Sequence, residues 1–119
     1  IDHGVRCVDD PQLVTRLIDE KIHLTVCPLS NTKLKVFASM EQHNIVELLC
    51  EGVSVGINSD DPAYFGGYMN DNFNAVANAH PLTYEQLAKF TSNAIDASFC
   101  SAQRKHELQQ QLQVYLDKQ

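Results

Sequence analysis

The chain has 119 residues, of which 44% are hydrophobic and 20% charged, as is typical of a soluble globular segment of one domain or less. A net charge of −6, with Lys and Arg scattered along the chain, argues against a nucleic-acid partner. No apolar run approaches the ~20 residues of a membrane span, and no signal peptide is visible. Four cysteines without C-x-x-C spacing favour free thiols in a reducing cytoplasm over disulfides or a cysteine-only metal site.

The first half of the chain alternates strands with helices. Apolar periodicity predicts a strand end, a helix, a strand, a long loop with a weak helical turn, a helix and a strand, over residues 1–3, 10–21, 22–27, 29–40, 41–51 and 53–58. Asp10 and Pro11 suit a helix start, because the carboxylate caps the first turn and proline lacks an N–H that the turn would leave unused. We expect a parallel α/β sheet of about three strands.

The second half predicts helices only. They are expected from residue 71 or 72 to 79, from a Thr83/Gln86 capping box onward, around 94–99, and from a Ser101 cap to about 116. The last helix has one apolar stripe and a Gln-rich face, which is typical of a covering helix. Three strands are too few to close a barrel, and the first residue is Ile rather than Met, so we expect a piece of a longer chain.

The most informative stretch runs from Val53 to Pro62. Its period-2 pattern predicts a buried strand, which stops at the adjacent carboxylates Asp60 and Asp61. Adjacent acids repel each other, so they favour an exposed loop unless a cation lies beside them. Taken alone, the stretch favours a simple polar turn over a site, because Asp and Pro are common turn residues.

Polar groups follow all three expected strands. His3-Gly4 follows the first, Pro28-Leu29-Ser30-Asn31 the second, and Asp60-Asp61 the third. The carboxyl ends of parallel strands share one rim, which is where ligands bind in such folds. Imidazole and carboxylates suit a zinc or iron site, but the chain alone cannot complete one. The remaining histidines are predicted to be surface or capping residues: His23, His43, His80 and His106.

Three of these segments together resemble the C-terminal half of the adenosine/adenine deaminase family. They are residues 1–6 (IDHGVR), 24–31 (LTVCPLSN) and 57–62 (INSDDP), in the family's order and spacing. Nearly the whole chain is covered by the resemblance. It implies the C-terminal part of a TIM-like (β/α)8 barrel with one catalytic zinc ion at the C-terminal rim, in a domain whose N-terminal half is absent from residues 1–119.

The resemblance also implies a role for each acid and for His3. Asp60 matches the zinc-ligand aspartate, which also holds the attacking water. Asp61 matches the aspartate that hydrogen-bonds a purine ring nitrogen, and His3 matches the histidine that orients the hydroxide. The family hydrolyses the exocyclic amino group of a purine and releases ammonia, so the implied partner is a small purine in the cytoplasm, with neither nucleic acid nor membrane. An oligomer is compatible with the resemblance.

The sequence departs from the family by lacking its His-x-His pair, its third zinc histidine and its His-Ala-Gly-Glu glutamate, all of which precede the matched region. We therefore expect the isolated 119-residue chain neither to hold zinc tightly nor to turn over. Deaminase activity of this polypeptide, free of any longer form, would contradict that expectation.

The motifs look most like those of bacterial and fungal adenine deaminases, which implies conversion of adenine to hypoxanthine in the parent protein. Two alternatives stay open from the sequence. One is an adenosine deaminase that makes inosine, and the other is a catalytically silent binding or structural fragment.

Overall fold

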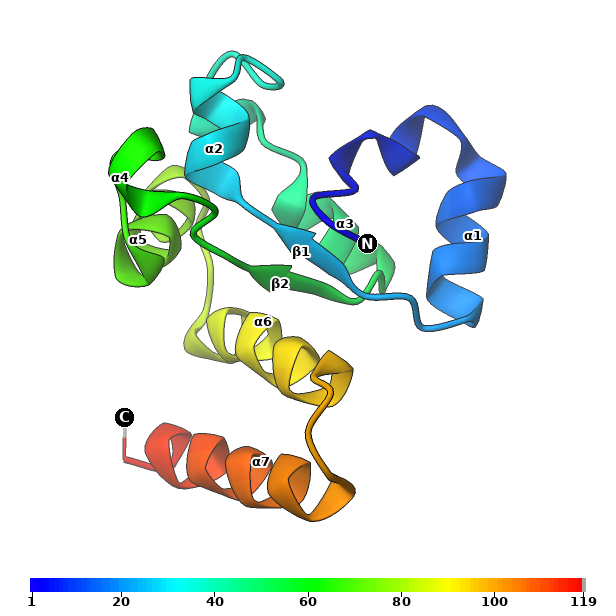
Figure 1. The fold of residues 1–119 in the computed structure, drawn as a ribbon, viewed down its shortest axis with the longest axis vertical. Coiled ribbons are helices and arrows are strands. Elements are labelled where there is room, and N and C mark those ends of the chain that lie inside the picture. The colour runs from blue at the N-terminus through cyan, green and yellow to red at the C-terminus, as the bar shows by residue number, and fades with distance from the viewer. Residues whose placement is uncertain (119) are drawn as a thin grey trace.

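A two-stranded parallel sheet lies at the centre of the computed structural model, which describes residues 1–118. Strand β1 (Leu24–Val26) pairs with β2 (Val55–Ile57), with Leu24 opposite Val55 and Val26 opposite Ile57 (Figure 1). On the other edge of β1, Asp2 forms a single parallel bridge to Thr25. The expected parallel α/β pattern is confirmed, although the first of the three expected strands is reduced to this bridge.

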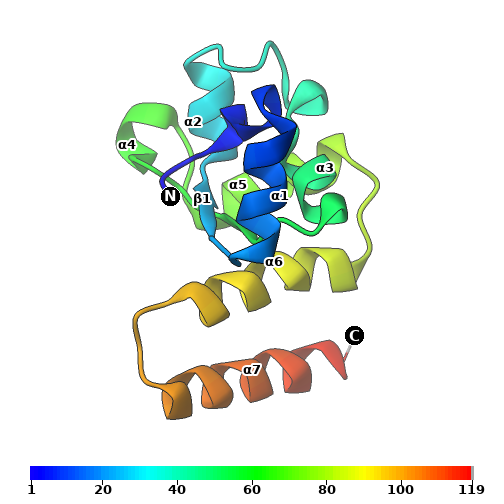
Figure 2. The same cartoon turned by 90° about the vertical axis from the view of Figure 1, so that its right-hand side faces the viewer.

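Nine helical segments surround the sheet within the described residues. In chain order they are η1 (Val5–Asp9), α1 (Pro11–Asp19), α2 (Pro28–Lys33), η2 (Met40–Gln42), α3 (Ile45–Glu51), α4 (Pro62–Phe65), α5 (Met69–Ala79), α6 (Tyr84–Ala97) and α7 (Ala102–Leu116). Helix α6 packs against β2, and α7 lies on the far side of α6, so that it forms an outer layer (Figures 1 and 2). The covering role expected for the last helix agrees with this arrangement, because α7 has no buried residue.

The structure differs from the sequence expectation mainly at three places, and helix α5 also begins earlier than expected, at Met69. The loop expected over residues 29–40 opens with helix α2, because Pro28 occupies its first position, where no N–H is needed. The helix expected from residue 41 begins only at Ile45, after a short 3-10 turn. The two helices expected between residues 83 and 99 form one helix, α6, since nothing in that stretch interrupts the backbone ladder before Ser98.

The hydrophobic core is built on both faces of the sheet. All three residues of β2 are buried, as are Leu24 and Val26 of β1. A strand buried on both faces is characteristic of a parallel sheet covered by helices on each side. Within residues 1–118, no helix is long and apolar enough to cross a bilayer.

Phe90 of helix α6 is fully buried and belongs to the same hydrophobic core as Val55 and Ile57 of β2. We expect Phe90→Ala to lower the free energy of unfolding of the complete protein that carries this chain by about 3–5 kcal/mol, because it removes a large apolar side chain and leaves a cavity. Urea denaturation measures the loss. Tyr84→Ala on the same helix is the matched control, since Tyr84 is 65% exposed; equal losses in the two variants would contradict the assigned packing.

Candidate active site

His3 leaves the sheet at the end of the first chain segment. Its backbone N–H donates to the Thr25 carbonyl at 3.0 Å, which fixes the segment beside β1. Gly4 follows with φ +74°, and a Cβ there would lie only 2.7 Å from Leu24 Cδ2. Glycine is therefore favoured on both backbone and steric grounds, and it lets the chain turn sharply after His3.

Asp60 follows β2 and has both carboxylate oxygens oriented by the protein. The hydroxyl of Ser30 donates to Oδ2 at 2.7 Å, and the backbone N–H of Asp61 donates to Oδ1 at 2.9 Å. Ser30 is fully buried in the first turn of α2, so this orientation comes from a rigid neighbour. Each oxygen still has a lone pair that these contacts leave available.

His3 and Asp60 share an uncommon backbone conformation. Their φ values are +55° and +56°, and they are two of only four non-glycine residues with positive φ among residues 1–118. A left-handed conformation at a non-glycine residue costs of order 1–3 kcal/mol and often marks a functional site. His3 directly follows the Asp2 bridge, and Asp60 lies three residues after the end of β2, so the turned backbone redirects each side chain at the rim.

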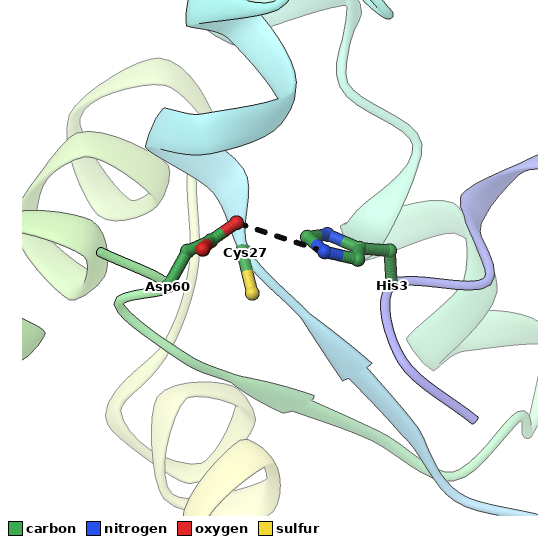
Figure 3. Close-up of side chains that lie close together, drawn as sticks. All are labelled: His3, Cys27 and Asp60. Carbon is green, nitrogen blue, oxygen red and sulfur yellow. Dashed lines mark ion pairs between the residues drawn. The ribbon is translucent and has the colours of Figure 1, made fainter. Parts of the chain in front are cut away.

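The structure brings His3, Asp60 and Cys27 together at the carboxyl ends of the strands (Figure 3). His3 Nε2 lies 3.6 Å from Asp60 Oδ2, and one ligand atom from each of the three residues lies within 4.8 Å of the others. These residues border a hollow of about 370 Å³, together with Asp2, Thr25 and Asn58. The His3 and Asp60 positions singled out from the sequence therefore converge on one rim.

Cys27 was not singled out as a site residue by the sequence. Burial, followed by the nearby Asp60 carboxylate, raises the pKa of its thiol to about 11. The thiol therefore keeps its proton at neutral pH when no cation lies beside it. Its place at the end of β1, directly before Pro28, was the only signal in the sequence.

Asp61 lies outside this cluster. Its Oδ1 accepts the Tyr64 N–H at 3.0 Å and thereby caps the short helix α4. Asp61 is exposed to solvent. Within residues 1–118, no donor contacts its other carboxylate oxygen, Oδ2. The Asp60 and Asp61 carboxylates thus contact different partners.

His43 corrects the expectation of a surface histidine, because it is only 2% exposed. Its Nδ1 accepts the Ile45 N–H at 3.1 Å, at the start of α3, so the expected capping role is present. Its Nε2 lies 3.1 Å from Asn31 Oδ1, and Asn31 Nδ2 lies 3.3 Å from His3 Nδ1. Tertiary packing therefore connects His43 to the site, which no local pattern in the sequence indicated.

The other three histidines lie apart from the site. His23 contacts the Ser54 hydroxyl, His80 contacts the Met40 carbonyl, and His106 contacts Gln110 on the exposed face of α7.

The family comparison matches the model of the adenosine deaminase family to residues 1–115. Among curated proteins, the adenine deaminase of Vibrio parahaemolyticus is 65% identical, with 92% of this chain and 34% of that protein covered. The chain spans about a third of the length of the curated relatives it matches.

Two solved structures have the same fold over 98% of this chain. The crystal structure of adenine deaminase from Arthrobacter aurescens is 41% identical, with a TM-score of 0.96 and 36% of its own chain covered. A Burkholderia ambifaria amidohydrolase with bound Zn is 23% identical, with a TM-score of 0.87 and 33% covered. The likeness confirms the expected fold class, part of a TIM-like (β/α)8 barrel.

His43 makes stability depend on pH. Burial, followed by the charge of His80, lowers its pKa from 6.5 to about 4. Between pH 6.5 and 4, His43 is protonated in the unfolded chain but neutral in the folded chain. The free energy of unfolding therefore falls as the pH drops from 6.5 to 4. We expect the wild-type protein to lose about 3 kcal/mol more than His43→Gln across this window. Urea unfolding of both proteins at several pH values measures the difference, and parallel curves would contradict it.

Proposed function

This chain belongs to the adenosine deaminase family, and we propose that it is the C-terminal part of an adenine deaminase, which hydrolyses adenine to hypoxanthine and ammonia. The observation that carries the choice of substrate is the set of curated relatives at 53–65% identity, each named adenine deaminase. The convergence of His3 and Asp60 at one rim supports a hydrolytic site at this place in the fold.

Asp60 suits a zinc ion as one ligand. Its carboxylate is ionisable, oriented by Ser30 and Asp61, and 28% exposed toward the hollow, so a cation can approach it. Zinc accepts a carboxylate oxygen beside imidazole ligands. We propose that the remaining ligands precede residue 1 in the complete barrel.

A zinc ion bound here supplies a water molecule with a pKa lowered toward about 7, which is nucleophilic at neutral pH. Asp60 would bind the ion and orient this water through the lone pairs that its protein contacts leave available. His3 Nε2, 3.6 Å from Asp60 Oδ2, would donate to the attacking oxygen and stabilise charge as it develops. The amino group leaves as ammonia, and the water oxygen becomes the carbonyl of hypoxanthine.

Asp61 is proposed to hold the purine. Its uncontacted carboxylate oxygen is available to accept a hydrogen bond from a ring N–H, while the other oxygen caps α4. Because the cap ties the carboxylate to a short helix, the acceptor is presented in one orientation. This contact selects the purine tautomer that carries a ring proton at that position.

The proposal places residues 1–119 as the C-terminal fragment of one metal-dependent barrel domain. It also places the protein in the cytoplasm, because all four cysteines are free thiols and Cys50 is exposed. The sequence before residue 1 is informative, since the absence there of His-x-His and His-Ala-Gly-Glu would refute an active enzyme.

Steady-state kinetics of the complete, zinc-loaded protein distinguish the two purines. We expect kcat/KM for adenine to exceed that for adenosine by at least about tenfold, since a pocket shaped for the free base excludes the ribose. Ammonia release measures both rates. Faster turnover of adenosine would replace the proposal with adenosine deamination.

Substitution of the two acids separates their roles. Asp60→Asn is expected to lower both bound zinc and kcat by at least about a hundredfold, because a ligand is lost. Asp61→Asn is expected to retain zinc and to lower kcat/KM about 10- to 100-fold, in keeping with the loss of one hydrogen bond to a charged group. Zinc content by elemental analysis and adenine turnover provide the measurements.

Asp19→Asn is the matched control for these two variants, because Asp19 is exposed at the end of α1 and far from the rim. It removes the same charge and should leave both zinc content and turnover unchanged. Full zinc content in Asp60→Asn would refute the ligand role, and full activity in Asp61→Asn would refute the purine contact.

A further inference from the structure

We propose that Asn31 and His43 are positioning residues that hold His3 in the tautomer with its proton on Nε2. The side of His3 that faces Asp60 then presents an N–H rather than a lone pair. The inference rests on the proposed function, because it describes how His3 is prepared for its role there. It adds two residues that no part of the proposed mechanism uses.

Three contacts in series connect the Ile45 backbone to His43, His43 to Asn31, and Asn31 to His3. The direction of the first hydrogen bond, from Ile45, determines the direction of the other two. A backbone N–H can only donate, and this one points at His43 Nδ1 from 3.1 Å. Nδ1 must therefore be the unprotonated nitrogen of His43. Burial keeps the ring neutral, with a pKa lowered to about 4, so its single proton lies on Nε2.

The next contact fixes the orientation of the Asn31 amide. His43 Nε2–H lies 3.1 Å from Asn31 Oδ1, which accepts its proton. The reversed amide would set the Asn31 NH2 against the His43 N–H, two donors face to face in a buried place. Asn31 is only 3% exposed, so no solvent is at hand to relieve such a conflict.

The oriented amide then determines the tautomer of His3. Asn31 Nδ2 lies 3.3 Å from His3 Nδ1 and can only donate to it. The lone pair of Nδ1 is thereby occupied, and the neutral ring carries its proton on Nε2. This is the nitrogen that lies 3.6 Å from Asp60 Oδ2.

The tautomer of His3 determines whether its Nε2 can donate a hydrogen bond. With the proton on Nε2, His3 donates a hydrogen bond to an oxygen on the Asp60 side and stabilises negative charge there. In the other tautomer, the same nitrogen would offer a lone pair and repel that oxygen. The tautomer of a catalytic histidine can change turnover by orders of magnitude with little change in geometry.

Asn31→Asp tests this series of hydrogen bonds from Ile45 to His3, called the relay below, with almost no change in side-chain shape. A carboxylate has only acceptors, so it still accepts from His43 and now also accepts from His3, whose proton should move to Nδ1. Two-bond ¹H–¹⁵N spectra of the complete protein with labelled histidines report which ring nitrogen carries the proton, and His3→Gln identifies the signal. We expect Nε2–H in the wild type and Nδ1–H in Asn31→Asp.

Kinetics provide the second measurement. We expect Asn31→Asp to lower kcat for adenine about 10- to 100-fold while KM changes by less than about threefold, since the substrate is not contacted. His43→Gln keeps an N–H donor toward Asn31 and should retain the wild-type tautomer, whereas His43→Phe removes the donor and should lose it. Asn74→Asp, exposed on α5, adds the same charge as a control.

The outcomes separate the two proposals. A wild-type spectrum with the proton on Nδ1 of His3 overturns the relay by itself, without any variant. An unchanged tautomer and an unchanged kcat in Asn31→Asp overturn it as well. If the wild type does not deaminate adenine, the proposed function fails, while the spectra still decide whether Asn31 and His43 set the tautomer.

Discussion

The site depends on the parallel pairing of β1 with β2. The register sets Leu24 beside Val55 and Val26 beside Ile57, and the Asp2–Thr25 bridge adds the first segment on the other edge of β1. All three segments run in one direction, so their carboxyl ends meet at one rim. The burial of β2 on both faces makes a slip of register costly, because it would expose apolar side chains.

Rigid secondary structure holds the side chains at this rim. Ser30 belongs to α2 and orients the Asp60 carboxylate, while Asn31, the next residue on the same helix, reaches His3. One short helix therefore contacts both sides of the site. The left-handed backbone at His3 and Asp60 is unfavourable in isolation, and the paired strands and this helix offset its cost.

In the proposed arrangement, His43 sets the tautomer of His3 through Asn31. His43 is neutral because it is buried, and its backbone partner determines which nitrogen holds its proton. The hydrogen bonds from His43 to Asn31 and from Asn31 to His3 take their directions from that first contact. A carboxylate in place of His43 would not transmit this polarity, because it only accepts hydrogen bonds and could not donate to Asn31.

Much of the fold and part of the site were predictable from the chain itself. Period-2 alternation identified the strand before Asp60, and residues after each strand pointed to one rim, because parallel strands share a direction. The family resemblance rested on short ordered motifs that include His3, Asp60 and Asp61. Helix α2 was expected only as a weak helical turn within a long loop, since its six residues carry too little periodicity to signal a helix.

Contacts between distant segments were decided only by the tertiary structure. The sequence by itself determined which residues form the buried strands and which polar groups follow them, because local periodicity and turn chemistry are properties of neighbours in the chain. Only folding decided that His43 is buried against Asn31 and that Cys27 faces His3 and Asp60. The contacts that join His43 to Asn31 and His3 to Asp60 connect residues 12 and 57 positions apart in the sequence, so no local pattern records them.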